Sequence, residues 1–382
     1  MTMETKSYKL EEIAQSFYYG SMPQEKLICD SGYPIFTGYR YTGYYSEYNI
    51  SRRSIVVVAR GVGGTGDVRI AEEKTFLTNL SIAVDIDTSI VDIDYLKYYL
   101  NIQGLRYLDS GAAQSQITIN SLKRHRVFLP EIKAQKSIVA VLSAYDNLIE
   151  ANNKRIKVLE QMAENLYKEW FVRFRFPGHE TAEFENGIPE GWFFRRADEV
   201  IDFNPTLKTG NQTEFTIIPM EALSTNSMVL DSSCFVRQDS ISGRRSQNGD
   251  TLLAKITPCL ENGKTGFVMG MPENEVLGGS TEFVVMRSKA LTPHYVYCIA
   301  RSYYFRQTAI LSMNGADGRQ RVDEDKLKST KILQPEKTVL DHFETIVTPI
   351  FDGVYQMVQV NKNLIKQRDM LLPRLMSGKL EV

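Results

Sequence analysis

The sequence predicts an α+β protein in which two similar α/β domains are separated by two long helices packed as an antiparallel coiled coil. Three observations support this fold class: a long internal repeat, two helical stretches of about 40 residues, and short β-branched runs ahead of each stretch. The repeat has an offset of about 200–208 residues. Because solenoid repeats have periods of about 20–50 residues, this period corresponds to a whole domain plus a helix.

The repeat is clearest at two loops that precede the helical stretches. The loop GAAQSQ at 111–116 corresponds to GADGRQ at 315–320. Each loop is followed by a strand-like stretch that ends at a proline, Pro130 in the first half and Pro335 in the second. A long helical pattern follows each proline, so the chain looks duplicated.

Apolar runs predict the central strands of each half. In the first half the run at 54–59 is β-branched and continuous, and the run at 81–86 alternates. The stretches at 251–254 and 281–286 have the same roles in the second half. The halves are expected to meet in the turn-rich stretch at 177–192.

The two long helices are predicted at 131–171 and at about 336–376, and a heptad repeat fits both. The first stretch contains neither glycine nor proline. Pro349, Gly353 and Pro373 are expected to kink or shorten the second. A helix of about 40 residues spans about 60 Å, so an antiparallel pair would carry one domain at each end.

A polar residue interrupts the apolar stripe of each helix: Asn152 occupies a d position and Asn361 an a position. Antiparallel packing places a opposite d, so pairing of the two asparagines would fix the register. The alternative is that each stripe is a core face packed on its own domain. In the antiparallel register the apolar interface pairs are Leu142 with Leu371, Ile149 with Leu364, Ile156 with Met357, and Leu159 with Val354.

The composition is that of an ordinary globular protein. The 382 residues, 43% hydrophobic and 24% charged, predict two or three domains. We expect a cytoplasmic protein, because the N-terminus lacks an apolar signal region and no apolar run approaches the ~20 residues of a membrane span. The four cysteines and four histidines are scattered, so no metal or cofactor is expected. A net charge of −1 does not by itself suggest a nucleic-acid partner.

The glycine-rich run 61–66 has the spacing of a dinucleotide fingerprint, but its context differs. The next residues resemble the return strand of a hairpin, whereas a pyrophosphate site needs a helix N-terminus there. We therefore interpret the run as a hairpin tip, with Arg60 and Gly63 as candidate DNA contacts. Lys255 is expected at the place that corresponds to Arg60, with Lys264 near the second tip. The alternative is solvated charge on a loop.

Further candidate DNA contacts are polar, basic or aromatic residues in predicted loops. Glutamine and arginine make bidentate contacts to adenine and guanine edges, and the loops at 111–116 and 315–321 differ in these residues. The alternative for these loops is turn chemistry alone. The candidates are Gln114, Ser115 and Gln116 in the first loop, Arg319, Gln320 and Arg321 in the second, the cluster of Arg40, Tyr41, Tyr44 and Tyr45, and the pair Arg244 and Arg245.

No catalytic constellation is evident. The tripeptide at 204–206 (NPT) departs from the tetrapeptide with which amino-methyltransferases grip a flipped base. No glycine-rich S-adenosylmethionine loop is present. The run at 324–326 (EDK) is interpreted as a solvated helical turn in preference to part of a nuclease site.

Taken together, the motifs resemble those of the specificity subunits of type I restriction-modification systems. The resemblance covers essentially the whole chain. It rests on the duplicated plan and the glycine-alanine loops, together with GIPEGW at 187–192, GDTLLAK at 249–255, the TINSLK…LP run at 118–130 and LMSGKL at 375–380.

The resemblance implies two pseudo-twofold-related target-recognition domains, each reading one half of a split, asymmetric site in double-stranded DNA. It also implies helices that set the spacing and dock two modification subunits, with restriction subunits joining in some systems. The chain itself would be a non-catalytic subunit. Two alternatives are a coiled-coil adaptor that does not read DNA and a stand-alone methyltransferase or nickase with degenerate motifs. The expected boundaries are 1–130 for the first recognition domain, 131–175 for the central helix, 176–335 for the second domain and 336–382 for the C-terminal helix.

Overall fold

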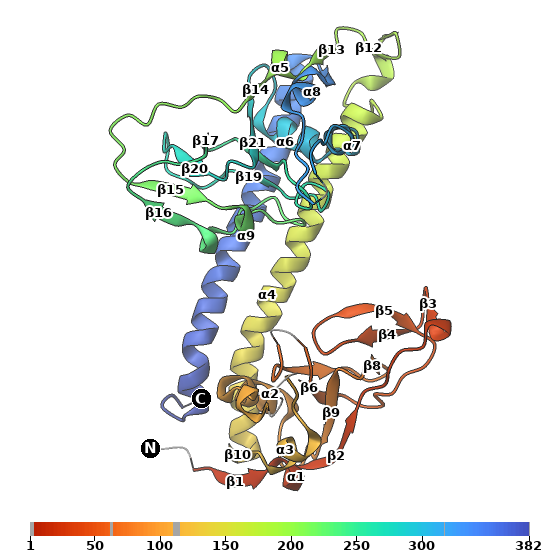
Figure 1. The fold of residues 1–382 in the computed structure, drawn as a ribbon, viewed down its shortest axis with the longest axis vertical. Coiled ribbons are helices and arrows are strands. Elements are labelled where there is room, and N and C mark those ends of the chain that lie inside the picture. The colour runs from red at the N-terminus through yellow and green to blue at the C-terminus, as the bar shows by residue number, and fades with distance from the viewer. Residues whose placement is uncertain (1–3, 62–63, 110–114, 317, 382) are drawn as a thin grey trace. The chain divides into compact units, whose positions relative to one another are not determined.

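A computed structural model describes residues 4–61, 64–109, 115–316 and 318–381. The chain forms two compact units (Figure 1). Unit 1 comprises Met1–Ile149 together with Asn363–Val382, and unit 2 comprises Glu150–Lys362. Each unit therefore contains one globular part, here called its head, and a segment of both long helices.

The head of unit 1 contains two four-stranded sheets and a short antiparallel pair. In the larger sheet the order is β2 (Ala14–Tyr19), β9 (Ser81–Ile86), β6 (Ser54–Val58) and β7 (Val68–Ala71), all antiparallel. The second sheet has the order β3 (Ile28–Cys29), β5 (Tyr41–Tyr45), β4 (Tyr33–Phe36) and β8 (Phe76–Leu77). Strand β1 (Lys6–Lys9) pairs with β10 (Arg126–Leu129), and the helices are α1 (Leu10–Ile13), α2 (Ile93–Gln103) and α3 (Ile119–Arg124).

The head of unit 2 has the same plan. Its larger antiparallel sheet has the order β14 (Ile201–Phe203), β21 (Phe283–Ser288), β18 (Thr251–Ala254) and β19 (Thr265–Phe267). The second sheet is β16 (Val236–Gln238), β15 (Phe215–Ile218), β20 (Leu277–Gly279) and β17 (Arg244–Ser246), and β13 (Phe193–Arg196) pairs with β22 (Lys331–Gln334). The helices are α5 (Ala197–Val200), α6 (Pro293–Arg301), α7 (Tyr303–Leu311) and α8 (Glu324–Ser329). The predicted α+β fold with two similar halves is therefore confirmed.

The central strand of each larger sheet is buried along its whole length. All five residues of β6 and all four of β18 are buried. This explains why their sequences are continuous β-branched or apolar runs, as expected for strands covered on both faces. Strand β7 is the return strand that the glycine-rich run predicts, since it pairs antiparallel with β6. The strand predicted at 281–286 begins two residues later, at Phe283.

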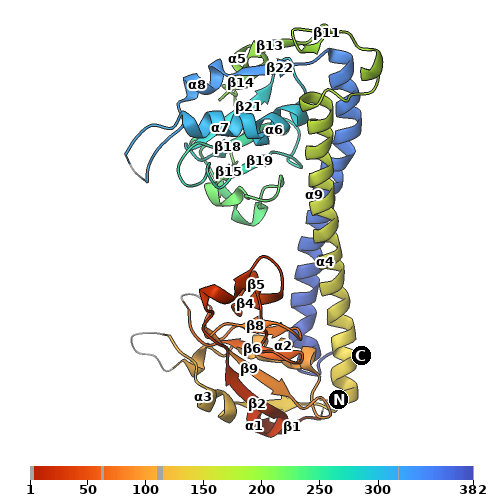
Figure 2. The same ribbon diagram turned by 90° about the vertical axis from the view of Figure 1, so that its right-hand side faces the viewer.

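The first long helix, α4, covers Ile132–Tyr167 and continues as a π-helical turn over Lys168–Val172. The second, α9, covers Lys337–Met376. Within each unit the two helices run side by side in opposite directions (Figures 1 and 2).

Helix α9 passes without interruption through Pro349, Gly353 and Pro373, so the expectation that these residues shorten it is wrong. A proline inside a helix removes one hydrogen bond and costs ~3 kcal/mol. Several large side chains on the same helix, among them Phe343 and Phe351, are fully buried in unit 2. Burial of each such side chain contributes about 1.5–3 kcal/mol, which is enough to keep the helix continuous.

Both long helices contribute to the core of each unit. In unit 1, Leu142 of α4 and Leu375 of α9 pack with the buried face of α2. In unit 2, Trp170 and Phe343 pack with Tyr295 of α6 in an aromatic cluster. Neither head therefore has a complete core without segments of both helices.

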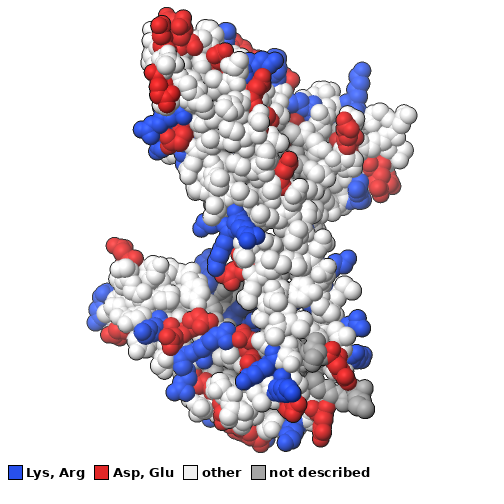
Figure 3. Space-filling model, turned by 180° about the vertical axis from the view of Figure 1, so that it is seen from behind, with Lys and Arg blue, Asp and Glu red and all other residues white. Residues whose placement is uncertain are grey.

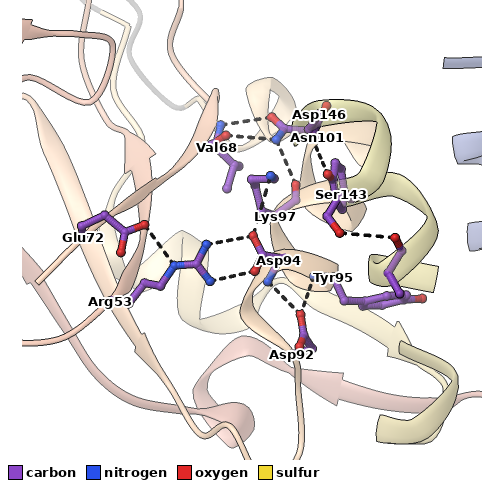
Figure 4. Close-up of polar contacts among 12 residues, drawn as sticks. Arg53, Val68, Glu72, Asp92, Asp94, Tyr95, Lys97, Asn101, Ser143 and Asp146 are labelled. Carbon is purple, nitrogen blue, oxygen red and sulfur yellow. Dashed lines mark hydrogen bonds and ion pairs between the residues drawn. The ribbon is translucent and has the colours of Figure 1, made fainter. Parts of the chain in front are cut away.

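A polar network also connects the head of unit 1 to the helices. Figure 4 shows the Arg53 guanidinium between Glu72 and Asp94, with distances of 3.1 Å from Nε to Glu72 and 2.7 Å from Nη1 to Asp94. Asp146 of α4 accepts hydrogen bonds from Tyr98 of α2 and from Arg368 of α9, the latter at 2.6 Å. One carboxylate thus joins three helices of unit 1.

The asparagine layer of the two helices lies in unit 2. Asn152 Nδ2 donates to Asn361 Oδ1 at 2.9 Å, and Asn361 Nδ2 donates to Asn153 Oδ1 at 2.9 Å. Asn152 and Asn361 are 5% and 6% exposed, so this is a polar contact inside an otherwise apolar seam. The apolar partners expected next to the layer, Ile156 with Met357 and Leu159 with Val354, lie together in the core of unit 2. In unit 1, Leu142 and Leu371 share one cluster, and Ile149 and Leu364 are half-buried.

We expect Asn361→Ala to destabilise the protein, because it leaves the buried amide of Asn152 without its partner. An unsatisfied buried polar group costs about 1–3 kcal/mol, which for a unit of this size lowers Tm by roughly 2–10 °C. Thermal unfolding followed by circular dichroism would measure the change. The double variant Asn152→Leu/Asn361→Leu should recover most of the loss, whereas Lys154→Ala on the exposed face of α4 should change little. An unchanged Tm for Asn361→Ala would contradict a structural role for the layer.

Candidate nucleic-acid interface

In both units the loop that precedes α3 or α8 lies against the end of the central strand. In unit 1, Ile117 N donates to Ala59 O at 3.0 Å. In unit 2, Val322 N donates to Lys255 O at 2.9 Å. The residues that follow the two predicted loops, Ile117 and Val322, are thereby tied to the strand ends that carry the predicted basic residues. In each unit the basic residue at the strand end and the polar loop lie more than 50 residues apart in the sequence, and together they form one candidate interface.

The hydrogen bonds correct one predicted equivalence. Ala59 N donates to Leu80 O, and Lys255 N donates to Glu282 O. Lys255 therefore corresponds to Ala59, and Arg60 corresponds to Ile256. Because successive side chains of an extended strand point to opposite faces, a shift of one residue places Arg60 and Lys255 on different faces of their sheets. The expectation that they occupy the same place is wrong.

The candidate interface of unit 1 contains the exposed Arg60, which forms an isolated bridge with Gln116. Gln116 N donates to Asp109 Oδ1 at 2.7 Å, and the Ser115 hydroxyl donates to the other oxygen of the same carboxylate. The carboxylate of Asp109 thus holds the end of the loop. Two predicted contacts, Gly63 and Gln114, lie outside the described residues.

Tyr39 is part of this interface, although the sequence reasoning overlooked it. A Cβ atom added to Gly64 would lie 2.1 Å from Tyr39 Cε1, and one added to Gly61 would lie 2.9 Å from the Tyr39 hydroxyl. The glycines therefore permit the ring to pack directly on the turn, and the ring stays 39% exposed. The sequence indicates this contact only weakly, because Tyr39 is a single tyrosine next to Arg40 and the glycine-rich run lies far from it along the chain.

The aromatic-basic cluster of unit 1 is only partly on the surface. Arg40 is exposed, and Tyr41 and Tyr44 are 51% and 46% exposed. Tyr45 is 2% exposed and packs against Phe76 with ring centroids 3.9 Å apart. Its predicted contact with a DNA backbone is therefore wrong: alternation along β5 turns this side chain into the core.

The basic residues of unit 2 gather around two carboxylates. Glu324 Oε1 accepts from Lys255 Nζ and from Arg244 Nη2, both at 2.8 Å. Glu324 Oε2 accepts from Asn204 Nδ2 at 2.8 Å. With these three contacts the Glu324 side chain is only 23% exposed, so its interpretation as a solvated turn residue is wrong.

The second carboxylate, Glu282, accepts a bidentate pair of hydrogen bonds from Arg321 at 2.7–3.0 Å. These hydrogen bonds hold the pKa of Glu282 below its ordinary value, and the positive charges of Lys255 and Arg244 add to the effect. The contact with Arg321 therefore favours the ionised form of this carboxyl.

Two of the four remaining candidates in unit 2 hold backbone groups with their side chains. Lys264 Nζ donates to Met220 O at 3.1 Å, and Arg245 donates to Leu207 O. Gln320 is half-buried, and its carbonyl accepts from Thr257. Arg319 is exposed, and within the described part of the chain its side chain has no hydrogen bond or ion pair.

Charge is mixed over the surface. On the face shown in Figure 3, acidic and basic side chains are interspersed with wide uncharged areas. That face therefore carries charges of both signs, in keeping with the net charge of −1. Sequence-independent attraction to phosphates would depend on local groups of basic residues.

The described residues include no group of three or more His, Cys, Asp or Glu side chains arranged to hold a metal ion. No helix in this part of the chain is long and apolar enough to cross a membrane. A cavity of about 1400 Å³ lies in unit 2 between α4 and the α6–α7 region, and tyrosines and apolar side chains form much of its wall.

Comparison with known proteins places this geometry in context. Residues 3–161 match the family model of the type I restriction modification DNA specificity domain. This part of the chain is therefore similar to a type I DNA specificity domain. The resemblance to type I specificity subunits that the motifs indicated is thereby confirmed.

Relatives of the chain are named type I restriction enzyme specificity subunits. The MjaVIII specificity subunit of Methanocaldococcus jannaschii is 22% identical over 375 residues, which are 92% of this chain and 86% of that protein. The MjaIX specificity subunit of the same organism is 24% identical over 289 residues, 73% of this chain and 66% of that protein. The crystal structure of the type I S subunit from M. genitalium covers 98% of this chain and 96% of its own, with a TM-score of 0.61 at 15% identity. This structural likeness supports the fold.

We expect Gly64→Ala to displace Tyr39 or strain the turn in unit 1, because the added methyl group would overlap the ring. Overpacking of this kind costs about 1–3 kcal/mol. A fall in Tm, or a change in the fluorescence of Tyr39 relative to a Tyr39→Phe reference, would report it. Tyr39→Ala/Gly64→Ala should restore the stability of Tyr39→Ala alone. If Gly64→Ala is as stable as the unmodified chain, the close packing is not a constraint.

Proposed function

We propose that this chain is the DNA sequence-specificity subunit of a type I restriction-modification complex. The observation that carries the proposal is the repeated arrangement of a loop tied to the end of a central strand, with different polar residues in the two copies. Each head would read one half of a split, asymmetric site in double-stranded DNA. The match of residues 3–161 to the DNA specificity domain and the relatives named as specificity subunits support this assignment.

The difference between the two loops supports two distinct half-sites. At this place unit 1 carries Arg60, Ser115 and Gln116, with Ser115 bound to Asp109, whereas unit 2 carries Arg319 and Arg321, with Arg321 bound to Glu282. Glutamine suits an adenine edge and arginine suits a guanine edge, so two such heads would prefer different bases. The target-recognition domains are proposed at 1–130 and 176–335, with spacer helices at 131–175 and 336–382.

We further propose that the long helices set the spacing of the half-sites and bind two modification subunits. Several large apolar side chains on these helices are exposed, and we take them as the candidates for this contact. The exposed apolar residues of α4 are Leu148, Val158 and Met162, and those of α9 are Ile346, Val360, Ile365 and Met370. Methyl transfer, and cleavage where restriction subunits are present, would be carried out by these partners, and this chain would act as a non-catalytic subunit.

The experiment that tests the function is genome-wide detection of methylated adenines. The chain is co-expressed with its modification partner, and the result is compared with a strain that lacks only this chain. The proposal predicts a split, asymmetric motif that disappears when the chain is absent. If methylation is unchanged although the partner is active, the chain does not select the target, and a role as a coiled-coil adaptor would be favoured.

Arg60→Ala and Arg319→Ala should each weaken DNA binding by the assembled complex, because both side chains are exposed and unpaired within the described residues. If each contacts one phosphate, the slope of log K against log salt concentration should become less negative by about 0.9. Fluorescence anisotropy at several salt concentrations measures this slope. Lys136→Ala, which removes an exposed charge from α4, is the matched control. Unchanged slopes for both arginine variants would rule out these phosphate contacts.

A further inference from the structure

Glu324 occupies an unusual position, because it joins four separate elements of the head of unit 2. It is the first residue of α8, and it contacts Arg244 on β17, Lys255 after β18 and Asn204 after β14. Each of the three contacts is 2.8 Å long. Glu324 thus determines where two basic side chains of the candidate interface lie.

Asn204 is itself held in place, and it fixes the position of the Glu324 carboxylate. Its backbone has a left-handed conformation with φ of 50°, which asparagine tolerates better than most residues. Its N–H donates to Val285 O at 2.7 Å, and its Oδ1 accepts from Val285 N at 3.0 Å. Because Oδ1 is already used, the side-chain amide must present its N–H to Glu324. The asparagine of the NPT tripeptide therefore orients the Glu324 carboxylate.

The fold does not require this ionic cluster. By hydrogen-bond register, Lys255 corresponds to Ala59 of unit 1. Asp323 caps α8 as Thr118 caps α3, so Glu324 corresponds to Ile119. Strand β17, which carries Arg244, pairs with β20, whereas the corresponding segment of unit 1 forms only an isolated antiparallel bridge between Ile50 and Thr75 and places Tyr48 where unit 2 has Arg244. The same architecture is thus built in unit 1 without these charges, which points to a role specific to unit 2.

The cluster is better suited to a base edge than to phosphates. The negative charge of Glu324 offsets one of the two positive charges, which weakens attraction to a phosphate. A guanidinium has five N–H donors. In the described part of the chain Arg244 uses one Nη group on Glu324, and the side chain remains 31% exposed. The remaining donors match the O6 and N7 acceptors of guanine, and a carboxylate that fixes the guanidinium lowers the cost of ordering it.

We infer that Glu324 is a positioning residue for base recognition: it orients Arg244, together with Lys255, toward a guanine edge in the half-site read by unit 2. This inference rests on the proposed function. It predicts that loss of the carboxylate changes base preference in one half-site only. A purely structural residue would lower stability and weaken both half-sites together.

The test compares Glu324→Gln and Glu324→Ala with the unmodified chain, each assembled with its modification subunits. Binding sites are selected from a DNA library randomised in both half-sites, and binding to non-specific DNA is measured in parallel. Discrimination for guanine at one position should fall about 5- to 150-fold in one half-site, with the other half-site unchanged. Because one negative charge is removed, non-specific binding should stay equal or become tighter.

Asp325→Ala is the matched control, because it removes an equal charge from the same helical turn. Asp325 is 92% exposed, and its side chain pairs with Lys328 at the surface. Its base preference should equal that of the unmodified chain, and Arg244→Ala should reproduce the effect of Glu324→Gln at the same position.

Several outcomes would overturn the inference. Unchanged preference in both folded Glu324 variants would remove the positioning role, and equal weakening of both half-sites, or loss of folding in both variants, would make Glu324 structural. If the unmodified complex shows no base preference at all, the proposed function itself fails, which distinguishes the two failures.

Discussion

Both compact units depend on the alignment of the same two helices. Unit 1 uses Leu142 and Leu375 to complete its core, and unit 2 uses Trp170, Phe343 and Phe351. Apolar contacts are tolerant of sliding, because one leucine can replace another along a seam. The Asn152–Asn361 hydrogen bond does not tolerate such sliding, because any other register leaves buried amides without partners. This polar layer therefore restricts the two helices of unit 2 to one alignment.

With the scaffold fixed, the heads can differ at their interfaces. The loop-to-strand hydrogen bonds from Ile117 to Ala59 and from Val322 to Lys255 are the same in both units. The side chains around them are not: unit 1 combines Arg60 with Tyr39 on a glycine turn, whereas unit 2 holds Lys255 and Arg244 on Glu324. A constant backbone with variable polar groups is the arrangement expected when one fold serves two recognition tasks.

The sequence predicted features that are encoded locally. The β-branched run of β6, the heptads of α4 and α9 and the polar positions within those heptads all have a periodicity that can be counted. Features that depend on tertiary contacts could not be predicted from the sequence. The one-residue offset between Arg60 and Lys255 requires the strand register, and the role of Glu324 requires four elements to meet. The expectation that proline shortens α9 was wrong, because local propensity is outweighed by burial of Phe343 and Phe351.

The central claim is that two heads each read one half of a split site. The most direct measurement is the affinity of the assembled complex for the intact site and for sites with the first half, the second half or both halves scrambled. The account predicts a large loss of affinity from each single scramble, with the double scramble reaching the level of non-specific DNA, about 10³–10⁷ weaker than the intact site. If scrambling one half leaves the affinity unchanged, only one head reads DNA and the account is contradicted.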